Sequence, residues 1–169
     1  MNKMLNNKAS IKQVFTFLLI AILIGLVFLF AIKVIPDLLD RTCDASFVLF
    51  VKDINSYLDK YSAFGSVNIK SLIIPCDYTE ICFVDAGALG KNIDKLELYD
   101  DQSINLMIRE SIIAGVEYNV FLVKGKVATP ITYSQKLRVI GADYICIPNI
   151  GGKAKIKFVG QGKTTGVTV

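Results

Sequence analysis

The amino-acid sequence predicts an α+β protein with one N-terminal transmembrane helix, and three observations support this fold class. Gln13–Ile32 contains 20 residues without a charge, and a helix of that length, at ~1.5 Å per residue, crosses the ~30 Å hydrocarbon core of a bilayer. Residues 36–63 then carry apolar side chains at a helical spacing, and residues 64–169 alternate as strands do. We therefore predict a transmembrane helix that continues into an amphipathic helix, packed against an antiparallel β-sheet head domain with one further short helix.

Residues 1–12 are a short basic leader. They include Lys3, Lys8 and Lys12 and no acid, so the positive-inside rule predicts a cytoplasmic N-terminus, a transmembrane helix over residues 13–35 and an extracellular C-terminal domain. A cleaved signal peptide is the competing interpretation, but its apolar core usually has about 7–15 residues, followed by a cleavage site of small residues. No clear site of that kind follows, and we expect a retained single-pass anchor in the cell membrane.

The next segment, residues 36–63, is predicted to be an amphipathic helix. Pro36 is expected to kink the helix or to start a second one. Beyond it, apolar side chains recur every three or four residues and share one helical stripe, which consists of Cys43, Phe47, Phe50, Ile54, Tyr57 and Tyr61. We expect a sheet to pack against this stripe.

Residues 64–169 are predicted to be a β-rich exterior domain that forms one unit with the amphipathic helix. Alternation and turn residues indicate strands over residues 66–75, 80–85, 118–123, 127–132, 137–140, 144–147 and 154–159. Pro130 cannot donate a ladder hydrogen bond, so residues 127–132 are expected to be an edge strand. The tail, residues 160–169, is expected to be a further edge strand or a loose end.

One short helix is expected between these strands. Asp100 or Asp101 is expected to cap it, and Gly115 to end it. Residues 91–99, which precede it, have an ambiguous pattern.

All four cysteines follow the predicted anchor, namely Cys43, Cys76, Cys82 and Cys146. An even number of cysteines outside the membrane is typical of two disulfides in an oxidising exterior, with three possible pairings. The alternatives are reduced, buried cysteines in a cytosolic domain, or a zinc site. No pair has the two-residue spacing of a zinc knuckle, so we predict no metal site.

The net charge of +4 is unevenly distributed along the chain. Residues 37–123 hold 14 acids and 7 bases, whereas residues 124–169 hold 8 bases and only Asp143 as an acid. The two halves either neutralise each other within one fold, or the acidic half of one copy meets the basic half of the next. A nucleic-acid partner is not expected, because such proteins usually carry a basic surplus across the whole domain.

A basic strip is the candidate interaction face. Lys153, Lys155 and Lys157 alternate along an expected strand, so all three point to one side of its sheet. Such a row is commonly a solvated face. The alternative is a strip that contacts lipid headgroups or the acidic half of a neighbouring copy.

No catalytic or cofactor-binding residue is predicted. The chain has no histidine, which removes the commonest general base and metal ligand. Gly160–Thr165 resembles a phosphate loop only superficially, because the first glycine of that motif is missing and no helix can follow. Asp94, Glu97, Asp100 and Asp101 lack the spacing of an EF-hand and are interpreted as a solvated, helix-capping group. No small-molecule substrate is evident.

The layout of a basic leader, an apolar helix, an amphipathic continuation and a β-rich head resembles that of type IV pilin-like proteins. In archaeal members the leader ends in a basic and a small residue, and the resemblance implies cleavage at Lys8-Ala9, before Ser10. The position of the glutamate of bacterial pilins is Val14 here. The chain also resembles single-anchor membrane proteins of small archaea that share a cysteine after the anchor and two further stretches, here Pro75, Cys76, Cys82, Phe83, Val84, Asp85 and Asn119–Val123.

These features predict a non-enzymatic, single-pass surface or envelope structural protein, with a pilin-like subunit as its most specific form. Its partners would be the lipid bilayer and further copies of the chain or a membrane complex. An accessory or binding subunit of a larger membrane complex is the alternative, and an anchored enzyme is a third hypothesis.

Overall fold

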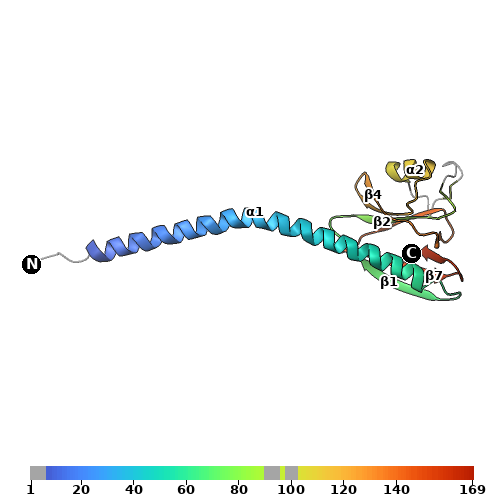
Figure 1. Ribbon diagram of the computed structural model, residues 1–169, viewed down its shortest axis with the longest axis horizontal. Coiled ribbons are helices and arrows are strands. Elements are labelled where there is room, and N and C mark those ends of the chain that lie inside the picture. Colours follow the sequence, from blue (N-terminus) through green and yellow to red (C-terminus); the bar gives the residue numbers. More distant parts are fainter. Residues whose placement is uncertain (1–6, 90–95, 98–102) are drawn as a thin grey trace, which may run out of the picture. The chain divides into compact units, whose positions relative to one another are not determined.

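The computed structural model describes residues 7–89, 96–97 and 103–169. The chain divides into two compact units, residues 1–44 and 45–169. Helix α1 (Asn7–Lys60) contributes to both units and is continuous through Pro36, so no second helix begins there (Figure 1).

Within the first unit, Gln13–Ile35 is long and apolar enough to span a membrane, by length and composition. None of this span is buried by the protein itself. Most of its side chains are large aliphatics and phenylalanines; Phe30, for example, is 69% exposed. The segment therefore exposes an apolar surface that the described residues of the chain do not cover.

The second unit contains two four-stranded sheets. Sheet A has the order β1-β7-β8-β5, with β1 (Val67–Ile73), β7 (Lys153–Gly160), β8 (Thr165–Thr168) and β5 (Leu137–Val139). Sheet B has the order β4-β3-β2-β6, with β4 (Val127–Thr132), β3 (Val120–Lys124), β2 (Glu80–Val84) and β6 (Tyr144–Pro148). Neighbouring strands are antiparallel except β5 and β8, which are parallel. The predicted α+β class with mainly antiparallel sheets is confirmed.

Two strands test the expectations about edges. β4, which contains Pro130, is an edge strand as predicted. The tail is neither an edge nor loose, because β8 lies between β7 and β5. Its residues Thr165, Gly166 and Val167 are all buried, and a Cβ at Gly166 would collide with the side chain of Ile140. Gly166 therefore allows the close packing of β8 against Ile140.

The main core lies where the two sheets face each other. The 45–60 segment of α1 contributes Phe50, Ile54 and Leu58 to it, and Tyr61 follows at the end of the helix. Phe47 and Tyr57 pack at the margin of this core, and the rings of Tyr57 and Tyr61 both contact Phe158 of sheet A. Five members of the predicted helical stripe therefore face the sheets.

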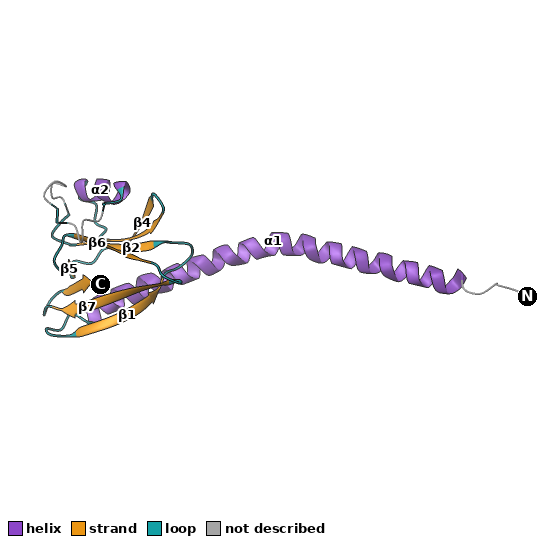
Figure 2. Ribbon diagram, turned by 180° about the vertical axis from the view of Figure 1, so that it is seen from behind, coloured by secondary structure: helices purple, strands orange, loops and turns teal. Residues whose placement is uncertain are grey.

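A second, smaller core lies on the other side of sheet B, beneath α2 (Leu106–Ile113). The buried side chains of this helix are Ile108 and Ile112. Figure 2 shows α2 on one side of β2 and β6, with β1 and β7 on the other. Sheet B is therefore covered on both faces, whereas sheet A is covered on its inner face.

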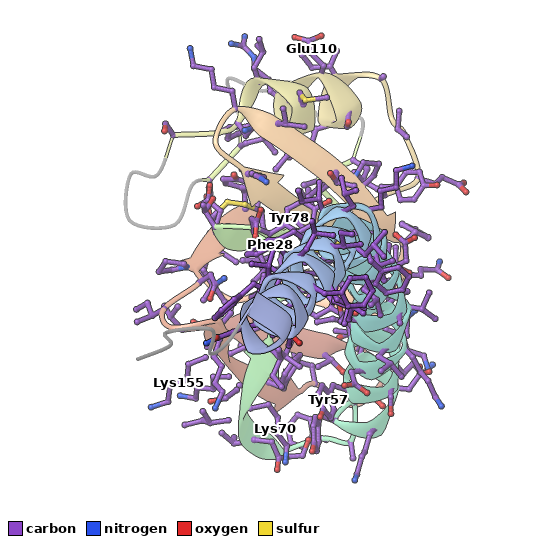
Figure 3. All side chains as sticks on the ribbon, turned by 90° about the vertical axis from the view of Figure 1, so that its left-hand side faces the viewer. Phe28, Tyr57, Lys70, Tyr78, Glu110 and Lys155 are labelled. Carbon is purple, nitrogen blue, oxygen red and sulfur yellow. A yellow bond between two sulfur atoms is a disulfide. The ribbon has the colours of Figure 1, made fainter. Side chains whose placement is uncertain are left out.

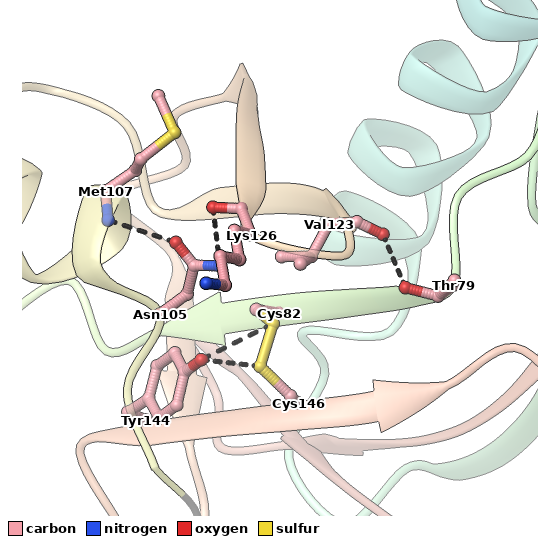
Figure 4. The surroundings of a disulfide bond; sticks show 8 residues. All are labelled: Thr79, Cys82, Asn105, Met107, Val123, Lys126, Tyr144 and Cys146. Carbon is pink, nitrogen blue, oxygen red and sulfur yellow. Dashed lines mark hydrogen bonds between the residues drawn. A yellow bond between two sulfur atoms is a disulfide. The ribbon is translucent and has the colours of Figure 1, made fainter.

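The ends of α2 differ in part from the prediction. The N-cap is Asn105, whose Oδ1 accepts the N–H of Met107 at 3.0 Å and whose amide nitrogen donates to the carbonyl of Lys126 at 3.2 Å (Figure 4). Neither aspartate at positions 100 and 101 starts this helix, and both lie outside the described residues. Gly115 ends the helix as expected, with a φ of 63° that suits a glycine.

Candidate interaction surface

Strand β7 has one buried and one outward side. Ala154, Ile156 and Phe158 are buried in the main core, and the residues between them point away from it. The outward set is Val159 and three lysines, Lys153, Lys155 and Lys157, and we call these lysines the lysine row. In Figure 3, Lys155 extends away from the sheet.

Strand β1 places aliphatic side chains beside the lysine row. Directly paired residues of antiparallel strands point to the same side of a sheet. Ile69 pairs with Lys157, Ser71 with Lys155 and Ile73 with Lys153. Ile69 is 56% and Ile73 70% exposed. The outer face of sheet A therefore combines branched aliphatic residues with ammonium groups.

The turn between β6 and β7 extends this face. Gly151 and Gly152 have φ values of 60° and 81°, and the N–H of Ile150 donates to the carbonyl of Lys153 at 2.9 Å. Two consecutive positive φ values are typical of a tight two-residue reversal, which requires glycine-like residues. This reversal leaves Ile150 at its corner, 76% exposed.

These elements enclose a shallow groove of about 760 Å³. Its walls consist of Ile69, Ser71, Ile147, Pro148, Ile150, Lys153, Lys155, Lys157 and Val169. The lining contains three cations and no carboxylate side chain. Ser71 is the one side-chain hydroxyl of the lining, and it is the direct strand partner of Lys155.

The lysines of the row differ from two exposed lysines of the second unit that are paired with aspartates. Lys124 contacts Asp77 at 2.9 Å, and Lys136 contacts Asp59 at 2.6 Å. Within the described ranges, no salt bridge involves the lysine row. Its positive charge is therefore available to a partner, and the aliphatic side chains around it favour a partner that also has an apolar part.

Sequence reasoning found the lysine row but missed its aliphatic surroundings. In the strand VNIKSLI, the usual rule of apolar inward and polar outward would turn Lys70 outward. Lys70 instead lies over the ring of Tyr61, with its Nζ 5.7 Å from the ring centroid, a cation–π arrangement. This contact accommodates a lysine on the inner side and leaves Ile69 and Ile73 outside. In the sequence, the aromatic residues of the predicted helical stripe were the one sign that a lysine could be accommodated on the inner side of β1.

A disulfide lies in the second core, on the opposite side of the unit. Cys82 and Cys146 are directly paired residues of β2 and β6, and their sulfur atoms are bonded (Figure 4). Cys43 and Cys76 are disulfide-bonded as well, and no described cysteine is free. The expectation of disulfides rather than reduced cysteines is confirmed.

Two titratable groups surround the Cys82–Cys146 bond. The hydroxyl of Tyr144 lies 2.6 Å from Sγ of Cys146, and burial raises the pKa of this tyrosine to about 12. Burial also raises the pKa of Glu80, whose carboxylate lies within 4.8 Å of both sulfurs. Two thiolates and a carboxylate could hold a metal, but sulfurs joined in a disulfide are not thiolate ligands.

The remaining predicted site residues are dispersed. Lys8, Ala9 and Ser10 lie in the first turns of α1, where only the backbone is described. Asp94, with the aspartates at positions 100 and 101, lies outside the described residues, and Glu97 is exposed. The structure thus brings together the lysine row, whereas three of the four residues of the acidic group lie outside the described residues.

The segment that resembles a phosphate loop connects two strands. Gly160 ends β7, Gly162 has a φ of 98° and Thr165 begins β8. No helix follows it, as the sequence indicated.

Comparison with known proteins gives no match, whether by family model, by similarity to curated proteins or by similarity to solved structures. The functional argument therefore rests on the chemistry of the chain's own surfaces.

Proposed function

We propose that the chain is a non-enzymatic, single-pass membrane protein that presents its disulfide-bonded β-rich domain outside the cell as a surface or envelope structural component. The observation that carries this proposal is the exposed, apolar surface of Gln13–Ile35, in which Lys33 is the one charged residue. A helix with this surface is unstable in water and stable in a bilayer, because its backbone hydrogen bonds are satisfied internally and its side chains are apolar.

The disulfides support the orientation. Structural disulfides persist in oxidising compartments and are rare in the cytosol. The cysteines all follow the apolar span, and the basic leader precedes it. An N-terminus in the cytoplasm and a C-terminal domain outside would satisfy both the positive-inside rule and the redox state.

The most specific form of the proposal is a pilin-like subunit, processed after Ala9. In an assembly of such subunits, the anchors would pack through Gly25 and the surrounding phenylalanines, Phe15, Phe17, Phe28 and Phe30. Nothing lies within 4 Å of the space that a Cβ on Gly25 would occupy, so this helix face is open to a neighbour.

The decisive experiment combines alkaline extraction with intact mass, using the protein from its native membrane. We expect the protein to remain in the membrane at alkaline pH, and its mass to increase on reduction by the amount expected for two disulfides. A mass lacking residues 1–9 would support the pilin-like form, whereas a full-length mass would contradict it. Release at alkaline pH would contradict the anchor itself.

An accessory or binding subunit of a membrane complex is the second candidate. The groove over sheet A favours it, because an unpaired lysine row among exposed aliphatics is a surface suited to binding. Affinity purification from native membranes should then recover a partner in stoichiometric amount. Recovery of the chain alone, in the same detergent, would contradict this candidate.

A further inference from the structure

The outer face of sheet A carries more exposed aliphatic surface than folding of the second unit requires. Five of its aliphatic side chains are 54–76% exposed, namely Val67, Ile69, Ile73, Ile150 and Val169. They surround the lysine row, and we call the combined surface the basic–aliphatic face. Soluble monomers rarely leave so many aliphatic side chains together on one face without a partner.

The arrangement of charge on this face limits the kinds of partner. Alternate residues of a strand are ~6.4–6.8 Å apart, so the lysine row distributes three cations over ~13 Å of β7. No acidic side chain lines the groove between them. A partner must therefore present several negative charges to the lysines and, directly beside them, an apolar layer to the aliphatic side chains.

A lipid surface with anionic headgroups has both properties. Lysine side chains bind such a surface electrostatically, while aliphatic side chains beside them enter the boundary between headgroups and acyl chains. The anchor keeps the domain close to membranes, so even weak contacts would operate at high effective concentration.

A second copy of the chain is the competing occupant, and the apolar boundary that a lipid surface adds to its negative charge is the reason to prefer lipid. Two exposed acids, Asp59 and Asp77, are already paired with lysines of their own chain, whereas Asp53 and Glu117 are exposed as well. On α2, the exposed residue Glu110 is adjacent to Arg109, which offsets its charge.

We propose that the basic–aliphatic face docks on anionic lipid bilayer surfaces. The lysine row contacts the phosphate-bearing headgroups, and Ile69, Ile73 and Ile150 enter the interface between them. This inference deepens the function proposed above, and it rests on that function because the anchor supplies the proximity to a membrane.

The test uses the full chain in nanodiscs of neutral phosphatidylcholine. The nanodisc bilayer holds the anchor and contains no anionic lipid to which the basic–aliphatic face could bind. Vesicles rich in phosphatidylglycerol are added, and co-sedimentation of nanodiscs with vesicles is measured. We expect binding that falls as salt rises, and little binding to vesicles of phosphatidylcholine alone. Empty nanodiscs provide the background.

Lysine variants locate the contact. The first variant replaces the whole lysine row and combines Lys153→Gln, Lys155→Gln and Lys157→Gln. Its affinity for the anionic vesicles should fall on the order of 100-fold, since each surface lysine contributes roughly fivefold. The matched control replaces three exposed lysines elsewhere, Lys52→Gln with Lys126→Gln and Lys163→Gln, and should bind nearly as the parent does. Equal losses in both variants would overturn the proposal.

A tryptophan reports the aliphatic contact independently. The chain has no tryptophan, so Ile150→Trp introduces a single reporter at the corner of the turn. Its emission should shift to the blue and be quenched by brominated anionic lipid, whereas Val127→Trp on β4 should be unaffected. No quenching at position 150 would overturn the proposal.

Two other outcomes would assign the face differently. Equal binding to neutral vesicles would overturn the role of the lysine row. Association of protein-bearing nanodiscs with one another, without vesicles, would make a second copy the occupant. Alkaline extraction from native membranes tests the anchor separately, so failure of vesicle binding with a retained anchor contradicts only this inference.

Discussion

The two sheets of the second unit differ in how many of their faces are covered. Sheet B has the main core on one side and α2 on the other, and its strands β2, β3 and β6 are apolar almost throughout. Sheet A has the main core on one side only, and β7 alternates buried and outward residues. The number of covered faces therefore determines whether a strand's sequence is continuous or alternating in hydrophobicity.

This contrast also explains where binding chemistry is located. A strand covered on both faces must use almost every side chain for packing, so sheet B offers its disulfide and few polar groups. A strand covered on one face has every second side chain free. In β7 these free positions hold the lysine row.

The largest expected effects come from large side chains on either face of sheet B. Phe83 lies in the main core and Phe121 in the smaller core beneath α2. Phe83→Ala and Phe121→Ala should each lower the free energy of unfolding by ~3–5 kcal/mol, because each removes a fully packed ring. Urea unfolding of the full chain in detergent micelles measures this.

The control is Ile73→Ala on the outer face of sheet A. Ile73 is 70% exposed, and its loss should change the free energy of unfolding by less than ~0.5 kcal/mol. If Phe121→Ala were as harmless as Ile73→Ala, α2 would not cover sheet B in solution, and the contrast between the sheets would be wrong.

The next largest effect is expected from the disulfide that joins β2 to β6. Its cysteines are 64 positions apart in sequence, so the bond restricts a long loop of the unfolded chain. Replacing Cys82 and Cys146 together by alanine should lower the free energy of unfolding by ~2–4 kcal/mol. Chemical denaturation without reductant measures this.

The matched control for the disulfide is Tyr144→Phe, which keeps the buried ring and removes the hydroxyl beside Cys146. It should cost only ~0.5–1.5 kcal/mol. A double alanine variant as stable as the parent would mean that the bond contributes nothing. Peptide mapping without reductant should recover Cys82 and Cys146 in one linked peptide.

A smaller effect is expected where the two sheets are connected. Asp85 follows β2, and its carboxylate accepts the N–H of Val139 in β5 at 3.0 Å and that of Gly87 at 2.7 Å. The guanidinium of Arg138 lies 3.5 Å from it. Asp85→Ala should cost ~1–3 kcal/mol, because half-buried donors lose their acceptor. Thermal unfolding of the full chain measures this.

An exposed aspartate provides the comparison for Asp85. Asp77 contacts Lys124 at the surface, and Asp77→Ala should change the free energy of unfolding by less than ~1 kcal/mol. Equal effects of the two variants would show that Asp85 is merely another surface charge, and that the connection between the sheets depends on other contacts.

The features predictable from the sequence are those set by local patterns. Alternation and turn residues identify seven strands, and Pro130 identifies an edge, because period and missing donors act within a few residues. The lysine row was predictable for the same reason. The apolar residues that alternate with these lysines along β7 indicate which side of the strand is buried, and therefore that the lysines point outward.

Long-range contacts determined what local patterns missed. β1 could be oriented only by knowing that Lys70 meets Tyr61. The interior position of β8 depends on β5, a parallel partner distant in sequence. The pairing of Cys82 with Cys146 follows from the register of β2 against β6, which sequence patterns leave open. The groove depends on all of these registers together, so its shape was not predictable.

The smallest expected effect concerns the one acidic residue in the strands of sheet B. Burial raises the pKa of Glu80 above the ordinary value of 4.5, which means that the folded protein disfavours its charged form. As pH rises through 4.5, the unfolded chain releases this proton before the folded protein does. The unfolded state then binds fewer protons, so this group lowers stability as pH rises and has no effect at lower pH.

Glu80→Gln removes that dependence while keeping the shape of the side chain. At neutral pH the variant should be more stable than the parent by less than ~1 kcal/mol, because the side chain of Glu80 retains contact with water. Below pH ~4 the difference should vanish. Urea unfolding across this pH range, with Glu110→Gln on exposed α2 as control, measures it. A variant less stable than the parent at neutral pH would mean that the charge of Glu80 is favoured in the fold. Sheet B would then stabilise a charged side chain, and the idea that only sheet A has room for charged groups would be wrong.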